Sequence, residues 1–138
     1  MKEMIYKKKP SREKVILDKG FFKDYEYIIL NVGTHPCAYI CLNTNSKFYR
    51  KEYNEIPIDV HGGITFSEDK LYRVLEYSDE DDKEVLKTIE RDWIIGWDYN
   101  HLGDCNGSLG FCGRKYTTKE IKQEVEDAIN QLIALEDD

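Results

Sequence analysis

Apolar and polar residues alternate along several short stretches of the chain, and a period of two residues is the pattern of a β-strand. The first such stretch is residues 21–32, where Tyr27 and Ile29 share one face while Ile28 and Leu30 share the other. Because both faces carry apolar side chains, we expect this strand to lie in the centre of a sheet.

A second strand is predicted at residues 35–42, where both faces again carry apolar residues. Gly33 and Thr34 separate it from the first strand, which predicts a hairpin. Further strands are expected at several shorter stretches, and the last of these is rich in aromatic residues. These stretches are residues 56–60, 64–66, 71–77 and 93–99.

A short helix is predicted between the last two of these strands. Ser78 is a suitable N-cap for a helix that runs to Arg91. Val85, Leu86 and Ile89 would form its buried side.

The clearest predicted element is a helix near the end of the chain. Thr117 and Glu120 have the spacing of a capping box. Apolar residues then recur at steps of three and four over about 18 residues, or ~27 Å of helix. They are Ile121, Val125, Ala128, Leu132 and Leu135. We expect this stripe to pack on the sheet, and the alternative is a homodimer contact through Ile121, Val125 and Leu132.

The order of these elements indicates an α+β domain. Sequential strands predict an antiparallel sheet, and the C-terminal amphipathic helix would cover it as the second of two layers. The 138 residues suit a single domain. We place this domain at residues 21–138 and interpret residues 1–20 as a basic arm, with one short strand near Val15, Ile16 and Leu17.

The charge of the chain narrows the classes of ligand. The formal net charge is −7, which argues against general nucleic-acid binding, since a phosphate backbone requires a basic face. A local cationic pocket is still compatible with this charge. Its candidate residues are Arg50, Lys51, Arg91, Arg114 and Lys115.

The chain has neither a membrane span of about 20 apolar residues nor, in residues 1–14, the apolar core of a secretory signal. We therefore expect a cytoplasmic protein whose four cysteines are thiols. No two cysteines have the C-x2-C spacing of a zinc site. Cysteine side chains in the core are the favoured interpretation, and zinc binding is the alternative. The residues concerned are His35, Cys37, Cys41, Cys105 and Cys112.

Two motifs place histidine among glycine, aspartate and aromatic residues. The first motif is His61-Gly62-Gly63, followed by the hydroxyl of Thr65. Two glycines either expose backbone N–H groups to an anion or form an ordinary hairpin turn, and both interpretations stay open.

The second motif lies just beyond a predicted strand. Asp98, His101 and Asp104 recur at every third residue, and Tyr99 follows Asp98 directly. If the two motifs meet, His61 and these residues would suit a divalent metal, or a histidine acid–base pair oriented by aspartate. The spacing does not choose between these chemistries, and no familiar hydrolase signature is present.

Together the motifs resemble a family of small proteins encoded by phages and prophages. The resemblance lies in the sequence HGGITF at 61–66, the pattern W-x3-W-D-x2-H-x-G-D at 93–104 and the closing amphipathic helix. It implies a phage accessory protein in the bacterial cytoplasm, and such proteins often counter host defence. The residues carried over are His61, Gly62, Gly63, Asp98, His101 and Asp104.

The two motifs and the family resemblance suggest three alternative functions. The first is a module that binds a small anionic ligand, such as a nucleotide immune signal, through the two motifs. The second is an inhibitor that binds a host defence protein directly. The third is a metal- or histidine-dependent hydrolase of a phosphodiester-type bond, with His61, Asp98 and His101 as candidate catalytic residues.

Overall fold

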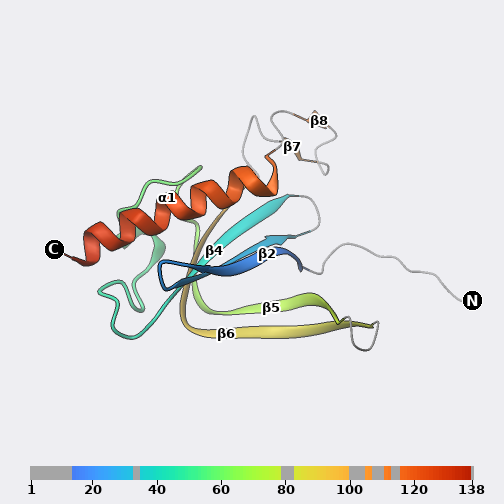
Figure 1. Cartoon of the computed structure of the whole chain (residues 1–138), viewed down its shortest axis with the longest axis horizontal. Helices are drawn as coiled ribbons and strands as arrows, with labels where there is room; N and C mark the ends of the chain where they lie inside the picture. The colour runs from blue at the N-terminus through green and yellow to red at the C-terminus, as the bar shows by residue number, and fades with distance from the viewer. Residues whose placement is uncertain are drawn as a thin grey trace, which may run out of the picture.

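The computed structural model describes residues 14–32, 35–78, 83–99, 105–106, 111–112 and 116–137. Five strands close into a barrel, and one long helix lies against its outside (Figure 1). The barrel strands are β2 (Lys14–Phe22), β3 (Tyr25–Asn31), β4 (Pro36–Leu42), β5 (Phe66–Ser78) and β6 (Lys83–Asp98). The other elements are the 3₁₀ turn η2 (Tyr53–Glu55), β7 (Cys105–Asn106), β8 (Phe111–Cys112) and α1 (Thr118–Glu136).

The predicted two-layer α+β fold with an antiparallel sheet is wrong, because the sheet closes on itself. The strand order is β2-β3-β4-β6-β5, and β2 then pairs in parallel with β5. This closure consists of the pairs Lys14–Val74 and Val15–Leu75. The closing strand β2 begins within the segment that we interpreted as an arm, and the short strand expected near Ile16 is part of it.

The predicted helix over residues 78–91 is also wrong. Those residues belong largely to β6, a strand of 16 residues that pairs with β5 in an antiparallel ladder. Ile89 pairs with Leu71, and Leu86 pairs with Leu75. The apolar residues that resembled one face of a helix are therefore distributed along a strand, and Leu86 is 44% exposed.

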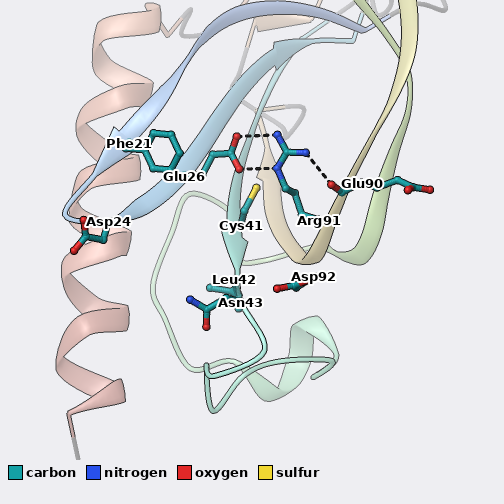
Figure 2. A pocket seen from close by; sticks show the side chains of 9 residues that line it. All are labelled: Phe21, Asp24, Glu26, Cys41, Leu42, Asn43, Glu90, Arg91 and Asp92. Carbon is teal, nitrogen blue, oxygen red and sulfur yellow. Dashed lines mark hydrogen bonds and ion pairs between the residues drawn. The ribbon is translucent and has the colours of Figure 1, made fainter.

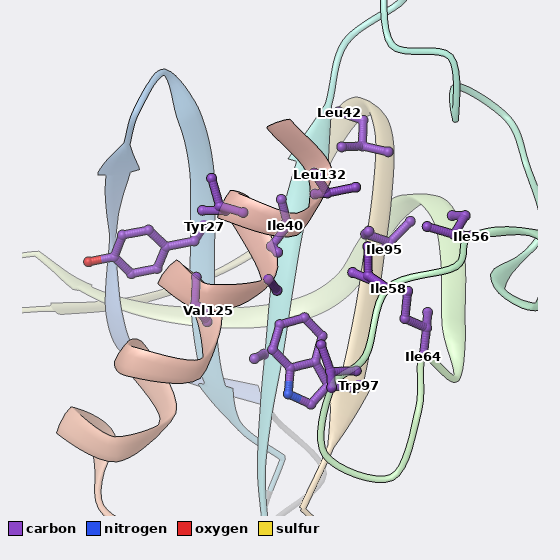
Figure 3. Packing of buried hydrophobic residues seen from close by; sticks show 14 of the residues in the cluster. Tyr27, Ile40, Leu42, Ile56, Ile58, Ile64, Ile95, Trp97, Val125 and Leu132 are labelled. Carbon is purple, nitrogen blue, oxygen red and sulfur yellow. The ribbon is translucent and has the colours of Figure 1, made fainter. Parts of the chain in front are cut away.

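The strand expected at residues 35–42 is confirmed as β4. The single strand expected at residues 21–32 is wrong in its first part, because a turn at Lys23 and Asp24, both with positive φ angles, separates the end of β2 from β3. β3 and β4 form the predicted antiparallel pair. Residues 56–60 form a connection rather than a strand, although Ile56, Ile58 and Val60 are buried. This connection packs over the barrel on the side of the helix (Figure 3).

The barrel separates two hydrophobic cores. The barrel-interior core consists of Ile28, Leu30, Cys37, Tyr39, Leu71, Val74, Ile89 and Ile94. The helix-side core lies between the outer face of the barrel and α1, and includes Tyr27, Ile29, Ile40, Trp97, Val125 and Leu132 (Figure 3). Since side chains alternate along a strand, β3, β4 and β6 supply residues to both cores.

Gly96 shows how closely the barrel interior is packed. A Cβ atom at this position would lie 2.5 Å from Cδ1 of Tyr39 and 2.8 Å from the carbonyl oxygen of Ala38. Only glycine leaves space for the tyrosine ring across the strand pair.

The C-terminal helix is confirmed as predicted. The Thr117 side chain accepts a hydrogen bond from the Glu120 N–H, and the Glu120 side chain accepts one from the Thr117 N–H. Ile121, Val125 and Leu132 are buried in the helix-side core, so their stripe is accounted for within one chain. Among the described residues, no helix has the length and apolarity needed to span a membrane.

Candidate functional site

The two motifs meet in space. The ring of His61 stacks on the ring of Tyr99, with centroids 4.6 Å apart and planes 11° from parallel. The Thr65 N–H donates to the carbonyl oxygen of Gly96 at 2.9 Å, and the Thr65 hydroxyl contacts Oδ2 of Asp98 at 3.4 Å. The segment after the first motif therefore runs beside the end of β6, which carries the second.

A carboxylate from α1 joins the motifs. Oε2 of Glu124 accepts a hydrogen bond from the His61 N–H at 2.7 Å, and Oε1 accepts one from the Tyr99 hydroxyl. The Trp97 indole N–H donates to the Tyr99 hydroxyl oxygen at 3.1 Å. The sequence does not indicate Glu124 as a site residue, because an acidic residue on an amphipathic helix has the same pattern as a solvated surface residue.

Tyr116 completes a cluster of three rings with His61 and Tyr99, here called the ring cluster. Its centroid lies 5.0 Å from that of His61 and 4.9 Å from that of Tyr99. Tyr99 is only 1% exposed, whereas His61 and Tyr116 are half-buried. The accessible part of the cluster is therefore His61 and Tyr116.

The hydroxyl group of the buried Tyr99 is held in its protonated form. Burial raises the pKa of Tyr99 above its usual value, and its hydrogen bond to the Glu124 carboxylate raises the pKa further. Tyr99 therefore remains a neutral hydrogen-bond donor at physiological pH.

The two glycines form a turn. Gly62 and Gly63 have φ angles of 70° and 83°, a region that glycine adopts without strain. The Gly63 N–H donates to the Val60 carbonyl oxygen at 2.9 Å, so the turn itself uses this group. Residues 56–65 form no strand, so the glycines make a turn within the connection that leads to β5 and not a hairpin between paired strands.

Part of the predicted site lies outside the described residues. His101 and Asp104 are in this part, so the suggested set of His61, Asp98, His101 and Asp104 is only half placed. Among the residues that the structure does describe, no group of three or more His, Cys, Asp or Glu side chains is arranged to hold a metal ion.

The cysteines suggested as zinc ligands lie in separate parts of the fold. Cys37 and Cys41 are free thiols on β4. Cys105 and Cys112 face each other in backbone register across β7 and β8.

The cationic candidates that the structure describes lie away from the ring cluster. Cζ of Arg50 lies 5.6 Å from the ring centroid of Trp93, and the carbonyl oxygen of Lys51 accepts a hydrogen bond from the Trp93 indole N–H at 2.9 Å. Nε of Arg91 is paired with Oε1 of Glu26 (Figure 2). Arg91 precedes Tyr99 by eight residues, or about 26 Å of strand length at about 3.3 Å per residue. Arg114 and Lys115 lie outside the described part of the chain.

The arrangement favours stacking and hydrogen bonding over bond cleavage. Two partly exposed rings lie beside a buried donor, and Glu124 already accepts hydrogen bonds through both of its oxygens. Comparison of the chain with protein-family models, curated proteins and solved structures found no match. The function therefore has to be inferred from this geometry.

Proposed function

We propose that the protein is a binding module that captures a small, planar, anionic ligand at the ring cluster. The observation that carries this proposal is the stack of the His61 ring on the Tyr99 ring, which joins the two motifs. His61 is partly exposed, and its backbone N–H is held by a hydrogen bond to Glu124. In a phage accessory protein, a nucleotide immune signal of the host is the ligand that fits this description.

The rings supply a surface for the base of such a ligand. Any nucleobase can stack on an aromatic side chain, because every base has a π-face. Tyr99 is covered, so the stacking surface would be the accessible parts of His61 and Tyr116. Glu124 fixes the backbone of His61, so the site would be ordered before the ligand binds.

The start of α1 supplies a favourable position for negative charge. Tyr116 lies two residues before the first residue of this 19-residue helix, so the ring cluster is next to the helix N-terminus. Backbone N–H groups and the helix dipole attract anions at that end. Thr65 is exposed near the same edge, where its hydroxyl contacts Oδ2 of Asp98 at 3.4 Å.

An enzyme is less well supported by the described residues. A general base must reach the proton that it removes, whereas Asp98 contacts Thr65 and Glu124 is occupied by Tyr99 and His61. The network holds side chains in place and leaves none of these carboxylates positioned as a base.

One observation favours direct protein binding as a second candidate. Large apolar side chains are exposed on β2, β5 and β6, and exposed apolar groups of this kind can form a protein interface. They include Val15, Leu17, Tyr72, Val85 and Leu86. An inhibitor of a host defence protein would use these exposed residues, of which Val85 and Leu86 lie near the start of β6, whereas the ring cluster lies beyond its end.

The two candidates can be separated by isothermal titration of cyclic dinucleotides and ADP-ribose derivatives into the full chain. His61→Ala removes a ring of the cluster, and we expect it to weaken binding about fivefold or more, since a stacked base contributes about 1–3 kcal/mol. His61→Phe keeps a ring and should retain most of the affinity. Tyr72→Ala removes an exposed ring elsewhere and should bind within twofold of the original chain.

Thermal unfolding of each variant checks that the fold is retained. The proposal is wrong if none of these ligands produces heat, or if His61→Ala binds as tightly as the original protein. Binding of a host protein that Tyr72→Ala abolishes and His61→Ala leaves unchanged would support the inhibitor instead.

A further inference from the structure

Two of the four cysteines lie opposite each other in a short antiparallel strand pair. β7 and β8 (Figure 1) pair so that Cys105 is the register partner of Cys112. Directly opposed residues of an antiparallel pair have Cα atoms about 4.5 Å or about 5.5 Å apart, according to their place in the hydrogen-bond ladder. Both distances fall within the range of about 4.4–6.8 Å that a disulfide spans. The backbone therefore places these two residues where a disulfide can form.

The other two cysteines cannot form such a pair with each other. Cys37 and Cys41 lie on the same strand, β4, and their separation in sequence corresponds to about 13 Å at about 3.3 Å per residue. Cysteines whose Cα atoms are more than about 7 Å apart cannot be bridged unless the backbone moves. The strand that carries Cys37 and Cys41 therefore keeps them apart.

Burial also makes the cysteines of β4 unreactive. It raises the pKa of the Cys37 thiol from 9.0 to about 12, and it raises the pKa of the Cys41 thiol to about 12 as well. The thiolate is the nucleophile in thiol–disulfide exchange, and these two groups form very little thiolate at neutral pH. Cys37 and Cys41 are therefore an internal reference that should stay reduced.

The opposed cysteines belong to a chain segment whose two ends meet in the ring cluster. The segment leaves the cluster at Tyr99 and returns to it at Tyr116, and the centroids of these two rings are 4.9 Å apart. In the sequence, both Cys105 and Cys112 lie between these rings. The fold thus fixes both ends of the segment, and the pairing of β7 with β8 aligns the cysteines within it.

We propose that Cys105 and Cys112 form a redox site, at which a low-molecular-weight disulfide such as oxidised glutathione converts the two thiols into an intramolecular disulfide. The thiolate of one cysteine attacks a sulfur of oxidised glutathione, which forms a mixed disulfide and releases one glutathione thiolate. The thiolate of the other cysteine attacks the protein sulfur of the mixed disulfide and releases the second.

The exchange is balanced and reversible. One S–S bond is broken in glutathione and one is formed in the protein, so two electrons pass from the protein to glutathione. The two thiol protons of the protein are taken up by the two released glutathione thiolates. An excess of reduced glutathione reverses both steps. In a reducing compartment the pair is therefore a redox-sensing site rather than a permanent cross-link.

This inference is independent of the proposed function, because its test counts thiols and requires no ligand. The full chain is equilibrated at neutral pH in mixtures of reduced and oxidised glutathione, quenched with acid, unfolded and alkylated. Mass spectrometry then counts the remaining thiols and identifies the linked peptides. We expect two of the four thiols to be lost in oxidising mixtures, with Cys105 linked to Cys112 and the two cysteines of β4 alkylated.

The glutathione ratio at the midpoint gives the effective concentration of one thiol at the other. Any two cysteines near each other in a flexible chain can pair, so the same measurement in concentrated urea provides the reference. Because the register aligns the pair, we expect the effective concentration to be about tenfold or more higher in the folded chain. Equal values in the folded and the unfolded chain would contradict the inference.

Cys105→Ser removes one partner, so Cys112 should form only the mixed disulfide with glutathione. Cys41→Ser is the matched control, because it removes a thiol of β4 and keeps a hydroxyl group as donor to Glu26. It should form the disulfide at the same glutathione ratio as the original chain. A changed ratio in this control, or a disulfide that includes Cys41, would contradict the assignment.

A register variant tests the alignment directly. Phe111→Cys combined with Cys112→Phe moves the second cysteine opposite Asn106, and we expect the effective concentration to fall about tenfold toward the value in urea. The inference is wrong if this variant forms the disulfide as readily as the original chain. It is also wrong if all four thiols survive in the most oxidising mixture, or if the disulfides join two chains.

Discussion

The two hydrophobic cores share three strands but differ in composition and in what they border. The barrel-interior core consists of strand residues alone. The helix-side core adds residues from α1 and from the connection after β4. Its Tyr99 accepts a hydrogen bond from Trp97 and donates one to Glu124 of α1. The helix-side core therefore borders the ring cluster, whereas the barrel-interior core is confined to the strands.

The strongest test of this division compares two residues of β6 on opposite faces. Trp97→Ala removes a large buried ring from the helix-side core, and we expect a loss of about 4 kcal/mol in the free energy of unfolding. Ile94→Ala in the barrel interior should lower the free energy of unfolding by about 3 kcal/mol. Urea denaturation, followed both by helical circular dichroism and by aromatic fluorescence, measures each loss.

In the original chain the two signals should change in one transition, because the same strands belong to both cores. Separate transitions for the helix and the barrel would contradict the view that the cores form one cooperative unit. An Ile94→Ala variant that loses its helical signal first would contradict the assignment of that residue to the interior.

Gly96→Ala provides a test of the barrel interior alone. The added methyl group would collide with the ring of Tyr39 and with the backbone at Ala38, so we expect a loss of about 2 kcal/mol. Gly20→Ala is the matched control, since its Cβ would lie 3.3 Å from the hydroxyl end of Tyr27, and we expect it to cost less than about 1 kcal/mol. Equal losses in the two variants, measured by urea denaturation, would contradict the tight packing inferred at Gly96.

The last test concerns how the stability contributed by the barrel interior depends on pH. Burial raises the pKa of the Cys37 thiol from 9.0 to about 12. Above pH 9 the unfolded chain loses this proton while the folded chain keeps it, so stability is complete below pH 9 and falls as the pH rises toward 12. The slope for one thiol is at most about 1.4 kcal/mol per pH unit.

Urea denaturation between pH 8 and pH 10.5, with a reductant present, should show this decline in the original chain and a weaker decline in Cys37→Ala. Tyr99→Phe should alter the slope only above pH 10, because the usual pKa of tyrosine is 10.0 and that of Tyr99 is raised. Identical slopes for the original chain and Cys37→Ala would show that this thiol is not protected in the folded state.

Local patterns in the sequence predicted the elements whose cause is local. The capping box at Thr117 and the stripe from Ile121 depend on residues within a few turns, and both were found. The apolar residues on both faces of residues 27–30 correctly indicated a central strand, and the reason is that each face borders a different core.

The remaining features depend on contacts between distant residues. Closure of the barrel joins Lys14 to Val74, a pairing that no local pattern reports. Val85, Leu86 and Ile89 match helical spacing, but pairing with β5 determined the outcome. His61 was identified from its motif, whereas Glu124 was found only because the fold brings α1 to that motif.

The alternation of side chains between the two faces of β6 also limits how related chains can diverge in sequence. A single inserted or deleted residue between Ile94 and Tyr99 would exchange the two faces and direct Trp97 into the interior beside Tyr39. We therefore expect natural variants to keep the length of this segment while changing its residues in matched pairs. A side chain larger than glycine at position 96 should occur together with one smaller than tyrosine at position 39.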